Sequence, residues 1–280
     1  MRFLLLFFLL FAQPLFAAPK VVASIPPLAG IVAKLMQGVG TPVTLLPANA
    51  PPHGFALRPS QLAALNEADI VFAIGLDMEP WLARVADGPV PIWLGETLSE
   101  PLPARNFDLS ARTASDPHLW LDPGETIAWV LEITQALIRL DRGNMATYRS
   151  NELALLREIV IAKERLQEIG ARLAQDDIRL VAAHDAYQYL EQRLGVPISG
   201  MLNDIGGIKA GARSLARLSR LEGEICLIID PNEPTPAGIL PGATRIEIDP
   251  IGAALGEGVD FTRRFYGGII TALETCLTQP

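Results

Sequence analysis

The chain contains only three histidines, His53, His118 and His184. A single histidine is usually a surface or core residue, but neutral imidazole is also a preferred ligand of Zn²⁺. Three imidazoles and one carboxylate can complete a tetrahedral zinc shell. Asp249 suits this set because it directly follows an apolar run, as His184 does. We therefore expect one Zn²⁺ per chain, bound by these four residues.

Short, β-branched apolar runs alternate with helix-like stretches, and these elements must position the four residues. The runs are 21–23, 43–46, 70–74 and 90–94 in the first half, and 180–182, 196–198, 225–229 and 245–248 in the second. Strands that alternate with helices imply parallel sheets covered on both faces. The predicted fold class is α/β, with two lobes that each hold a four-stranded parallel sheet.

The stretch between the two sets of runs predicts one long helix. Residues 144–175 contain no Pro and a single Gly, Gly170, and apolar residues recur at spacings of three and four. Two helices with a kink at Gly170 are the alternative. The expected organisation is a signal peptide (1–18), an N-terminal lobe (19–143), a rigid linking helix (144–175) and a C-terminal lobe (176–280).

This organisation places the candidate ligands at strand ends. In open α/β sheets, ligands bind beyond the carboxyl ends of the strands. His53, His184 and Asp249 each come after a predicted strand, and His118 opens an apolar segment. Each lobe supplies two of the four residues, so a cleft between facing lobes would bring them to one point.

The beginning of the chain has the pattern of a secretory signal peptide. Arg2 precedes an apolar run from Leu4 to Phe11, Gln13-Pro14 breaks that run, and the small residues Ala17 and Ala18 follow. The run is shorter than the roughly 20 residues that cross a bilayer, and a buried N-terminal helix is the alternative. The net charge of −8 argues against nucleic acid or anionic lipid as a partner. We expect an exported monomer.

The two cysteines, Cys226 and Cys276, are an even count. In an exported chain this predicts one disulfide, because the compartment is oxidising. Two unrelated buried thiols are the alternative.

Five motifs then carry a resemblance to a known family. They are Ala-Ser-Ile-Pro-Pro-Leu from Ala23, His-Gly-Phe-Ala-Leu-Arg-Pro-Ser from His53, Asp-Pro-His-Leu-Trp-Leu-Asp-Pro from Asp116, His-Asp-Ala-Tyr from His184, and Asp-Pro-Ile-Gly from Asp249. In this order they resemble the periplasmic metal-binding solute receptors of ABC importers, over essentially the whole mature chain.

The resemblance implies two lobes bridged by a rigid helix, with one metal between them that is handed to a membrane permease. A metallochaperone is a further partner to consider. The third ligand position, His184, resembles the zinc receptors, whereas manganese receptors tend to have Glu there. Cys226 and Cys276 also fall where such zinc receptors carry a disulfide.

Two departures from the family pattern matter. Nothing resembles the long, His- and acid-rich loop of many zinc receptors, which puts an accessory metal site in doubt. Pro52 stands where some relatives have a Glu that approaches the metal, which shifts the expected fourth ligand to Asp249. The alternative role for Asp249 is a helix N-cap.

Other functions stay open. One is a receptor for manganese or iron. Another is a secreted zinc hydrolase, because three histidines with an open position are also a catalytic arrangement. The chain has no His-Glu-x-x-His helix, and Asp185 would have to act as general base. A third is an adhesin built on the same fold.

Overall fold

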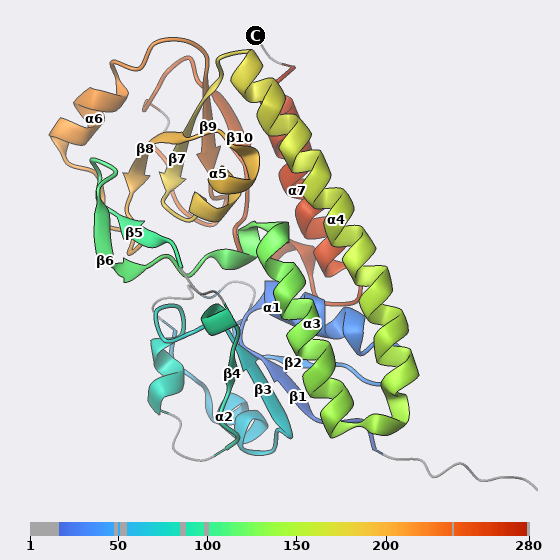
Figure 1. Ribbon diagram of the computed structural model, residues 1–280. Coiled ribbons are helices and arrows are strands. Elements are labelled where there is room, and N and C mark those ends of the chain that lie inside the picture. Colours follow the sequence, from blue (N-terminus) through green and yellow to red (C-terminus); the bar gives the residue numbers. More distant parts are fainter. Residues whose placement is uncertain are drawn as a thin grey trace, which may run out of the picture.

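Two lobes lie one above the other, and long helices run along one side of both (Figure 1). The computed structural model describes residues 17–47, 50, 55–84, 88–97, 101–236 and 238–278. His53 and most of the expected signal peptide lie outside these residues. No described helix is long and apolar enough to cross a membrane.

The N-terminal lobe holds a parallel sheet of order β2-β1-β3-β4. Its strands are β1 (Val21–Ala23), β2 (Val43–Thr44), β3 (Ile70–Ala73) and β4 (Ile92–Trp93). The helices of this lobe are α1 (Pro26–Leu35) and α2 (Pro59–Asn66), and short 3-10 turns follow at Pro80–Arg84 and Leu94–Thr97. The four predicted runs of the first half are all strands here.

The C-terminal lobe repeats this plan with a parallel sheet of order β10-β9-β7-β8. Its strands are β7 (Arg179–His184), β8 (Ile198–Asn203), β9 (Ile225–Ile229) and β10 (Thr244–Glu247). Its helices are α5 (Gln188–Leu194), α6 (Ala212–Leu218) and α7 (Phe261–Cys276), and a 3-10 turn lies at Ala253–Leu255. The predicted α/β class with two four-stranded parallel sheets is confirmed.

Two helices join the lobes. α3 (Pro123–Leu140) runs beside α4 (Met145–Gln175) (Figure 1), and a 3-10 turn at Arg142–Asn144 connects them. The long helix predicted over 144–175 is confirmed as α4. Its apolar side chains belong to one core cluster that extends into both lobes, among them Leu155, Ile159, Leu166, Ile169 and Leu173. The helix is therefore part of a continuous core rather than a free linker.

Gly170 has a different role from the kink considered above. α4 continues through it, and a Cβ at this position would lie 1.8 Å from the carbonyl oxygen of Leu194. The missing side chain lets the end of α5 approach the helix backbone.

The antiparallel hairpin of β5 (Pro103–Arg105) and β6 (Ala111–Ser115) has an unexpected place. Sequence assigns it to the N-terminal lobe, yet it lies beside β8 and α6 of the C-terminal lobe (Figure 1). Arg105 forms ion pairs with Asp185 at 2.5 Å and Glu191 at 2.7 Å. These contacts join the segment before His118 to the lobe that carries His184.

The predicted disulfide is present between Cys226 of β9 and Cys276 at the end of α7. It ties the last helix to the C-terminal sheet.

Candidate metal centre

His118 and His184 lie together between the lobes. His184 is the last residue of β7, and His118 directly precedes the 3-10 turn Leu119–Leu121. Their ring centres are 5.9 Å apart, with the ring planes at 85°. Two imidazoles on one tetrahedral zinc, each bonded at about 2.1 Å, place their ring centres roughly 5 Å apart. The observed pair is therefore close to the spacing that one ion requires.

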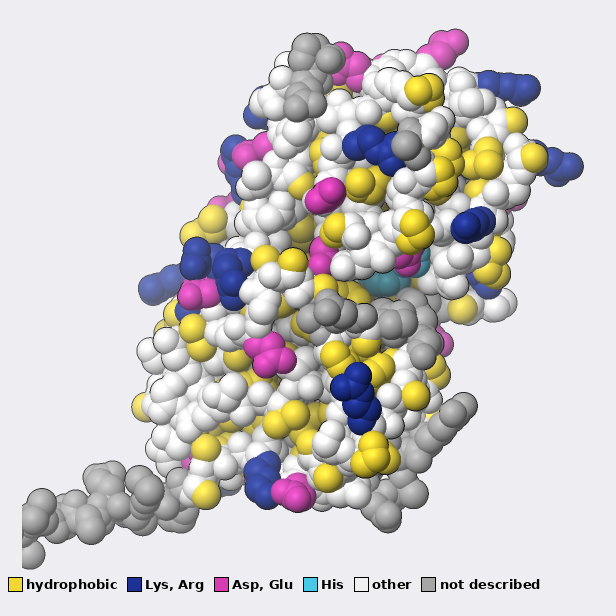
Figure 2. All heavy atoms as spheres, turned by 180° about the vertical axis from the view of Figure 1, so that it is seen from behind, with side chains coloured by type: hydrophobic (Ala, Val, Ile, Leu, Met, Phe, Trp, Pro, Cys, Tyr) yellow, Lys and Arg dark blue, Asp and Glu magenta, His cyan; other side chains and the backbone are white. Residues whose placement is uncertain are grey.

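Both histidines are largely buried. The exposed fraction is 3% for His118 and 5% for His184. Figure 2 shows histidine side chains at the waist of the molecule, between the upper and lower lobes. The ring of Trp120 lies 5.3 Å from that of His118. A cation held here would be partly removed from bulk water. Its attraction to the ring nitrogens would be stronger than in water, because the local dielectric constant is lower.

A buried carboxylate orients His118. Asp116 Oδ1 lies 2.8 Å from Nδ1 of His118 and accepts the backbone N–H of the same residue at 2.9 Å. Gln188 donates to the other oxygen, Oδ2, at 2.8 Å. When Nδ1–H donates to a carboxylate, Nε2 carries the lone pair that can bind a metal. Asp116 thus selects the tautomer that suits a ligand.

Asp249 follows β10 by two residues, and its carboxylate binds the backbone beyond it. Oδ1 accepts N–H groups from Ile251 and Gly252, both at 2.9 Å, and Oδ2 accepts that of Ala253 at 2.6 Å. The N-cap of the next turn, Ala253–Leu255, is Gly252, so Asp249 stabilises this loop without being the helix N-cap considered as the alternative. Each carboxylate oxygen has two lone pairs, so Oδ2 keeps one for a metal. These bonds to the backbone and a ligand role are compatible.

The four predicted ligands are only partly brought together. Within the residues that the structure describes, no three His, Cys, Asp or Glu side chains gather closely enough to hold a metal ion. His118 and His184 form a pair, and His53 lies outside the described residues. The ligand roles of His53 and Asp249 stay predictions.

Acidic side chains surround the C-terminal half of the site. Asp230 and Glu233 follow β9, and Glu233 Oε2 lies 3.9 Å from Nδ1 of His184. Burial raises the pKa of Asp230 to about 6, and the charges of Asp249 and Glu233 act in the same direction. Carboxylates that raise one another's pKa form a region of negative potential, which attracts cations.

Asp185, the candidate base of a hydrolase, is engaged elsewhere. It is fully buried, and its two carboxylate oxygens face the Arg105 guanidinium at 2.5 and 3.4 Å. A carboxylate held in this way does not face a metal-bound water. The arrangement disfavours the hydrolytic mechanism.

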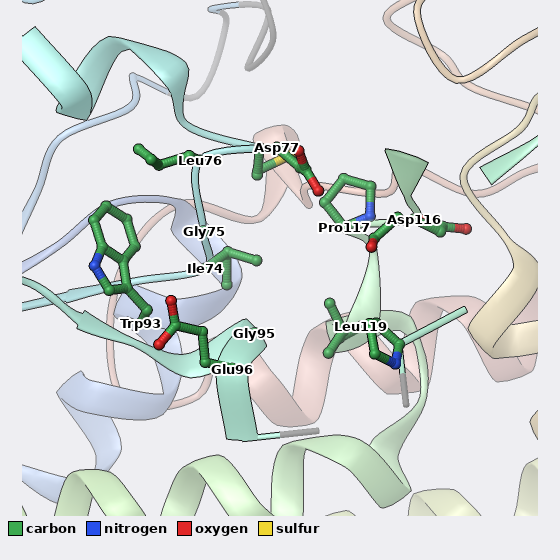
Figure 3. A pocket seen from close by; sticks show the side chains of 13 residues that line it. Ile74, Gly75, Leu76, Asp77, Trp93, Gly95, Glu96, Asp116, Pro117 and Leu119 are labelled. Carbon is green, nitrogen blue, oxygen red and sulfur yellow. The ribbon is translucent and has the colours of Figure 1, made fainter. Parts of the chain in front are cut away.

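A cavity of about 470 Å³ lies beside the segment that carries His118, and Asp116, Pro117 and Leu119 line it. In Figure 3, Trp93 and Glu96 of the N-terminal lobe lie on one side of it, and Pro117 and Leu119 lie opposite. The segment 115–119, which carries His118, therefore has open space on its N-terminal-lobe side.

Sequence reasoning missed three residues of this site: Asp116, Arg105 and Glu233. The spacing Asp-x-His was a usable signal for Asp116, because a carboxylate two residues before a histidine can reach its ring. Arg105 is separated from Asp185 by 80 residues, and nothing local marks that pair. Glu233 has no signal in the sequence either, because it reaches His184 from another strand's loop.

Comparison with known proteins gives consistent results. The family described as zinc-uptake complex component A, periplasmic, matches residues 21–225. The high-affinity zinc uptake system protein ZnuA of Paracoccus denitrificans is 27% identical over 312 residues, covering 92% of each chain. That of Brucella suis is 26% identical, with the same coverage.

The structural comparison agrees in fold. A crystal structure of ZnuA superposes with a TM-score of 0.73 at 23% identity, and covers 91% of this chain and 99% of that one. Since the family match extends over most of the sequence, this chain belongs to the family of periplasmic zinc-uptake complex component A.

Proposed function

We propose that this chain is a high-affinity periplasmic zinc-binding protein that delivers Zn²⁺ to an ABC transporter for zinc uptake. The observation that carries the proposal is the buried pair of His118 and His184, with Asp116 on Nδ1 of His118. The curated relatives that match the chain over 92% of its length are zinc uptake proteins, and their function supports this one.

The proposed ligand set joins the observed histidine pair with two residues that the sequence predicts. His118 and His184 supply two nitrogens, and His53 and Asp249 are the proposed third and fourth ligands. His184 stands on β7 and Asp249 after β10, in one sheet, whereas His53 comes from the other lobe's part of the chain. Zinc would therefore be held by groups from both lobes, and opening of the lobes would release it.

The donor types favour zinc over manganese. Mn²⁺ prefers oxygen ligands and usually takes six, while three imidazoles and one carboxylate suit a tetrahedral zinc site. Zn²⁺ also outranks Mn²⁺ in the Irving–Williams order. Cu²⁺ ranks higher still, so copper binding in vitro does not contradict a zinc role.

The cellular setting is part of the proposal. The leader directs export, and the family is periplasmic. We propose that the mature chain is a monomer, that its partner is the membrane permease of the importer, and that it binds no nucleic acid. Loading by a metallochaperone is compatible with this role.

Metal titration tests the function. Metal-free protein should take up one Zn²⁺ per chain, and replacement of His118 or His184 with Ala should weaken binding by at least 100-fold, because a three-ligand remnant must recruit water. His53→Ala should do the same. A His118→Ala variant that binds as tightly as the parent would remove the basis of the proposal.

Competition tests the choice of metal. A large excess of Mn²⁺ at neutral pH should leave zinc bound, as measured by metal analysis after desalting. Displacement of zinc at modest excess would instead identify a manganese receptor.

A further inference from the structure

We propose that Glu233 is a positioning residue for His184. Its carboxylate accepts the Nδ1–H of His184 when zinc is bound, so that Nε2 faces the ion. This inference rests on the proposed function, because it assigns a role at the same zinc site. It gives a role to a residue that is not among the four predicted ligands.

The first support is the location of Glu233. Its Oε2 lies 3.9 Å from Nδ1 of His184 and accepts a hydrogen bond from Nδ2 of Asn203 at 3.4 Å. Asn203 is the β8 residue that pairs with His184 of β7. The loop that carries Glu233 is fixed by its backbone N–H, which donates to the carbonyl of Asp230 at 3.1 Å. The carboxylate therefore lies over the strand end where His184 is.

The second support is the matching arrangement at the other histidine. Asp116 contacts Nδ1 of His118 at 2.8 Å. In both cases a carboxylate is on the Nδ1 side of the ring, which leaves Nε2 as the metal-binding atom. A carboxylate in this position fixes the tautomer and ring orientation and makes the imidazole a stronger ligand.

The two carboxylate–histidine pairs differ in how strongly the carboxylate is held in place. Asp116 is fully buried and receives three hydrogen bonds. The Glu233 side chain is 35% exposed. A shift of about 1 Å would bring its oxygen to hydrogen-bond distance from Nδ1. The His118 half of the site is thus arranged in advance, and the His184 half is completed by a small movement of Glu233 on loading.

Two other acids of this lobe make close contacts with other groups. Asp185 is bound by Arg105. Asp249 accepts backbone N–H groups on both oxygens, from Ile251, Gly252 and Ala253. Glu233, whose Oε2 lies 3.9 Å from Nδ1 of His184, is the carboxylate that the geometry assigns to this ring nitrogen.

The test uses Glu233→Gln and Glu233→Ala in the full mature chain. Zinc dissociation constants, measured by chelator competition, should rise about 10- to 100-fold, with Ala at least as large as Gln. The exposed Glu222 of the same lobe gives a matched control, and Glu222→Gln should bind as the parent does. Metal-free melting temperatures should be unchanged, since Glu233 lies in a partly exposed loop.

A spectroscopic readout separates positioning from a general loss of structure. In zinc-loaded parent protein, nitrogen NMR of the His184 ring should show Nδ1 protonated and hydrogen-bonded, with Nε2 bound to metal. Glu233→Gln should shift the Nδ1–H signal and leave the His118 ring signals unchanged. Glu233→Asp, which is one methylene shorter, should give an intermediate affinity.

Two outcomes would overturn this inference alone. Binding within twofold of the parent, with unchanged His184 signals, removes the positioning role. A loss as large as that of His184→Ala makes Glu233 a ligand instead. If the parent binds no zinc, the proposed function itself fails. If the parent binds zinc and the Glu233 variants bind it equally tightly, the proposed function stands and this inference alone is wrong.

Discussion

At the residue scale, Asp249 combines a structural contact with a proposed metal contact. Its carboxylate accepts the backbone N–H groups of Ile251, Gly252 and Ala253, in the segment that leads into the turn at Ala253–Leu255. Hydrogen bonds of this kind also orient carboxylates that bind metals. The same side chain can therefore stabilise its own loop and hold an oxygen toward the cleft.

We expect Asp249→Asn and Asp249→Ala to weaken zinc binding more than they lower the stability of the metal-free protein. The stability loss should be about 1 kcal/mol, the typical net contribution of a side-chain hydrogen bond to the backbone. Asp204 provides the comparison, because its Oδ1 accepts N–H groups of Gly206 and Ile208 in a similar turn. Asp204→Ala should lower stability and leave zinc affinity as it is. The same pattern at Asp249 would mean that Asp249 only stabilises its loop and does not bind the metal.

Glu79 predicts a pH dependence of stability. Its carboxylate is fully buried near the end of β3 and accepts bonds from Ser24 and the N–H groups of Ile74 and Gly75. Burial raises its pKa from 4.5 to about 7, against the opposing effect of these bonds. The folded protein therefore holds this proton more tightly than the unfolded chain does. Its contribution to the free energy of unfolding falls as pH rises from 4.5 towards 7.

Urea unfolding of metal-free protein between pH 5 and 8 measures this effect. Relative to Glu79→Gln, which does not titrate, the parent should lose about 2–3 kcal/mol of stability across that interval. Glu222→Gln, at an exposed position, should follow the parent. A parent-to-variant difference that stays constant with pH would contradict the assignment.

At the element scale, α4 depends on one missing side chain. The Leu194 carbonyl at the end of α5 lies where a Cβ on Gly170 would be. Glycine in a helix is normally less stable than alanine by about 1 kcal/mol. Here the close contact between two elements outweighs that propensity.

Gly170→Ala should therefore destabilise the protein by about 1–3 kcal/mol, the usual range for forcing extra atoms into a packed contact. Gly268 in α7 is the matched control, because a Cβ there meets nothing within 4 Å. Gly268→Ala should stabilise by about 0.5–1 kcal/mol. Thermal and urea unfolding of both variants give the comparison, and equal effects at the two positions would remove the argument.

At the scale of the whole molecule, one hydrophobic core joins the two lobes, and one disulfide bond ties the last helix to the C-terminal sheet. The main hydrophobic cluster includes residues of both lobes together with α4 and α7. The Cys226–Cys276 bond closes a loop of 50 residues between β9 and α7. In the chain-entropy model, such a loop reduces the freedom of the unfolded chain by about 4 kcal/mol.

Joint replacement of Cys226 and Cys276 with Ala should lower the melting temperature and leave zinc stoichiometry at one per chain. The reason is that the bond lies away from the histidine pair and acts through the unfolded state. Calorimetry and metal analysis measure the two quantities. Loss of zinc at a temperature where the variant is still folded would show that the bond supports the site directly.

Sequence alone determined the two lobes, the linking helix, the pair of cysteines and the candidate ligands. Strand and helix periodicities are local properties, so 21–23 or 144–175 could be assigned from their own residues. With only three histidines in the chain, the choice of ligands was narrow. The rings of His118 and His184 do lie 5.9 Å apart, as the expected convergence of strand ends and motifs required.

Tertiary structure alone decided which distant groups support those ligands. The β5–β6 hairpin packs on the C-terminal lobe because Arg105 meets Asp185 and Glu191, which are 80 and 86 residues away. Glu233 approaches His184 only because β9 lies beside β7 in the sheet. Such contacts depend on strand order and on packing between elements, and no local pattern in the chain encodes either.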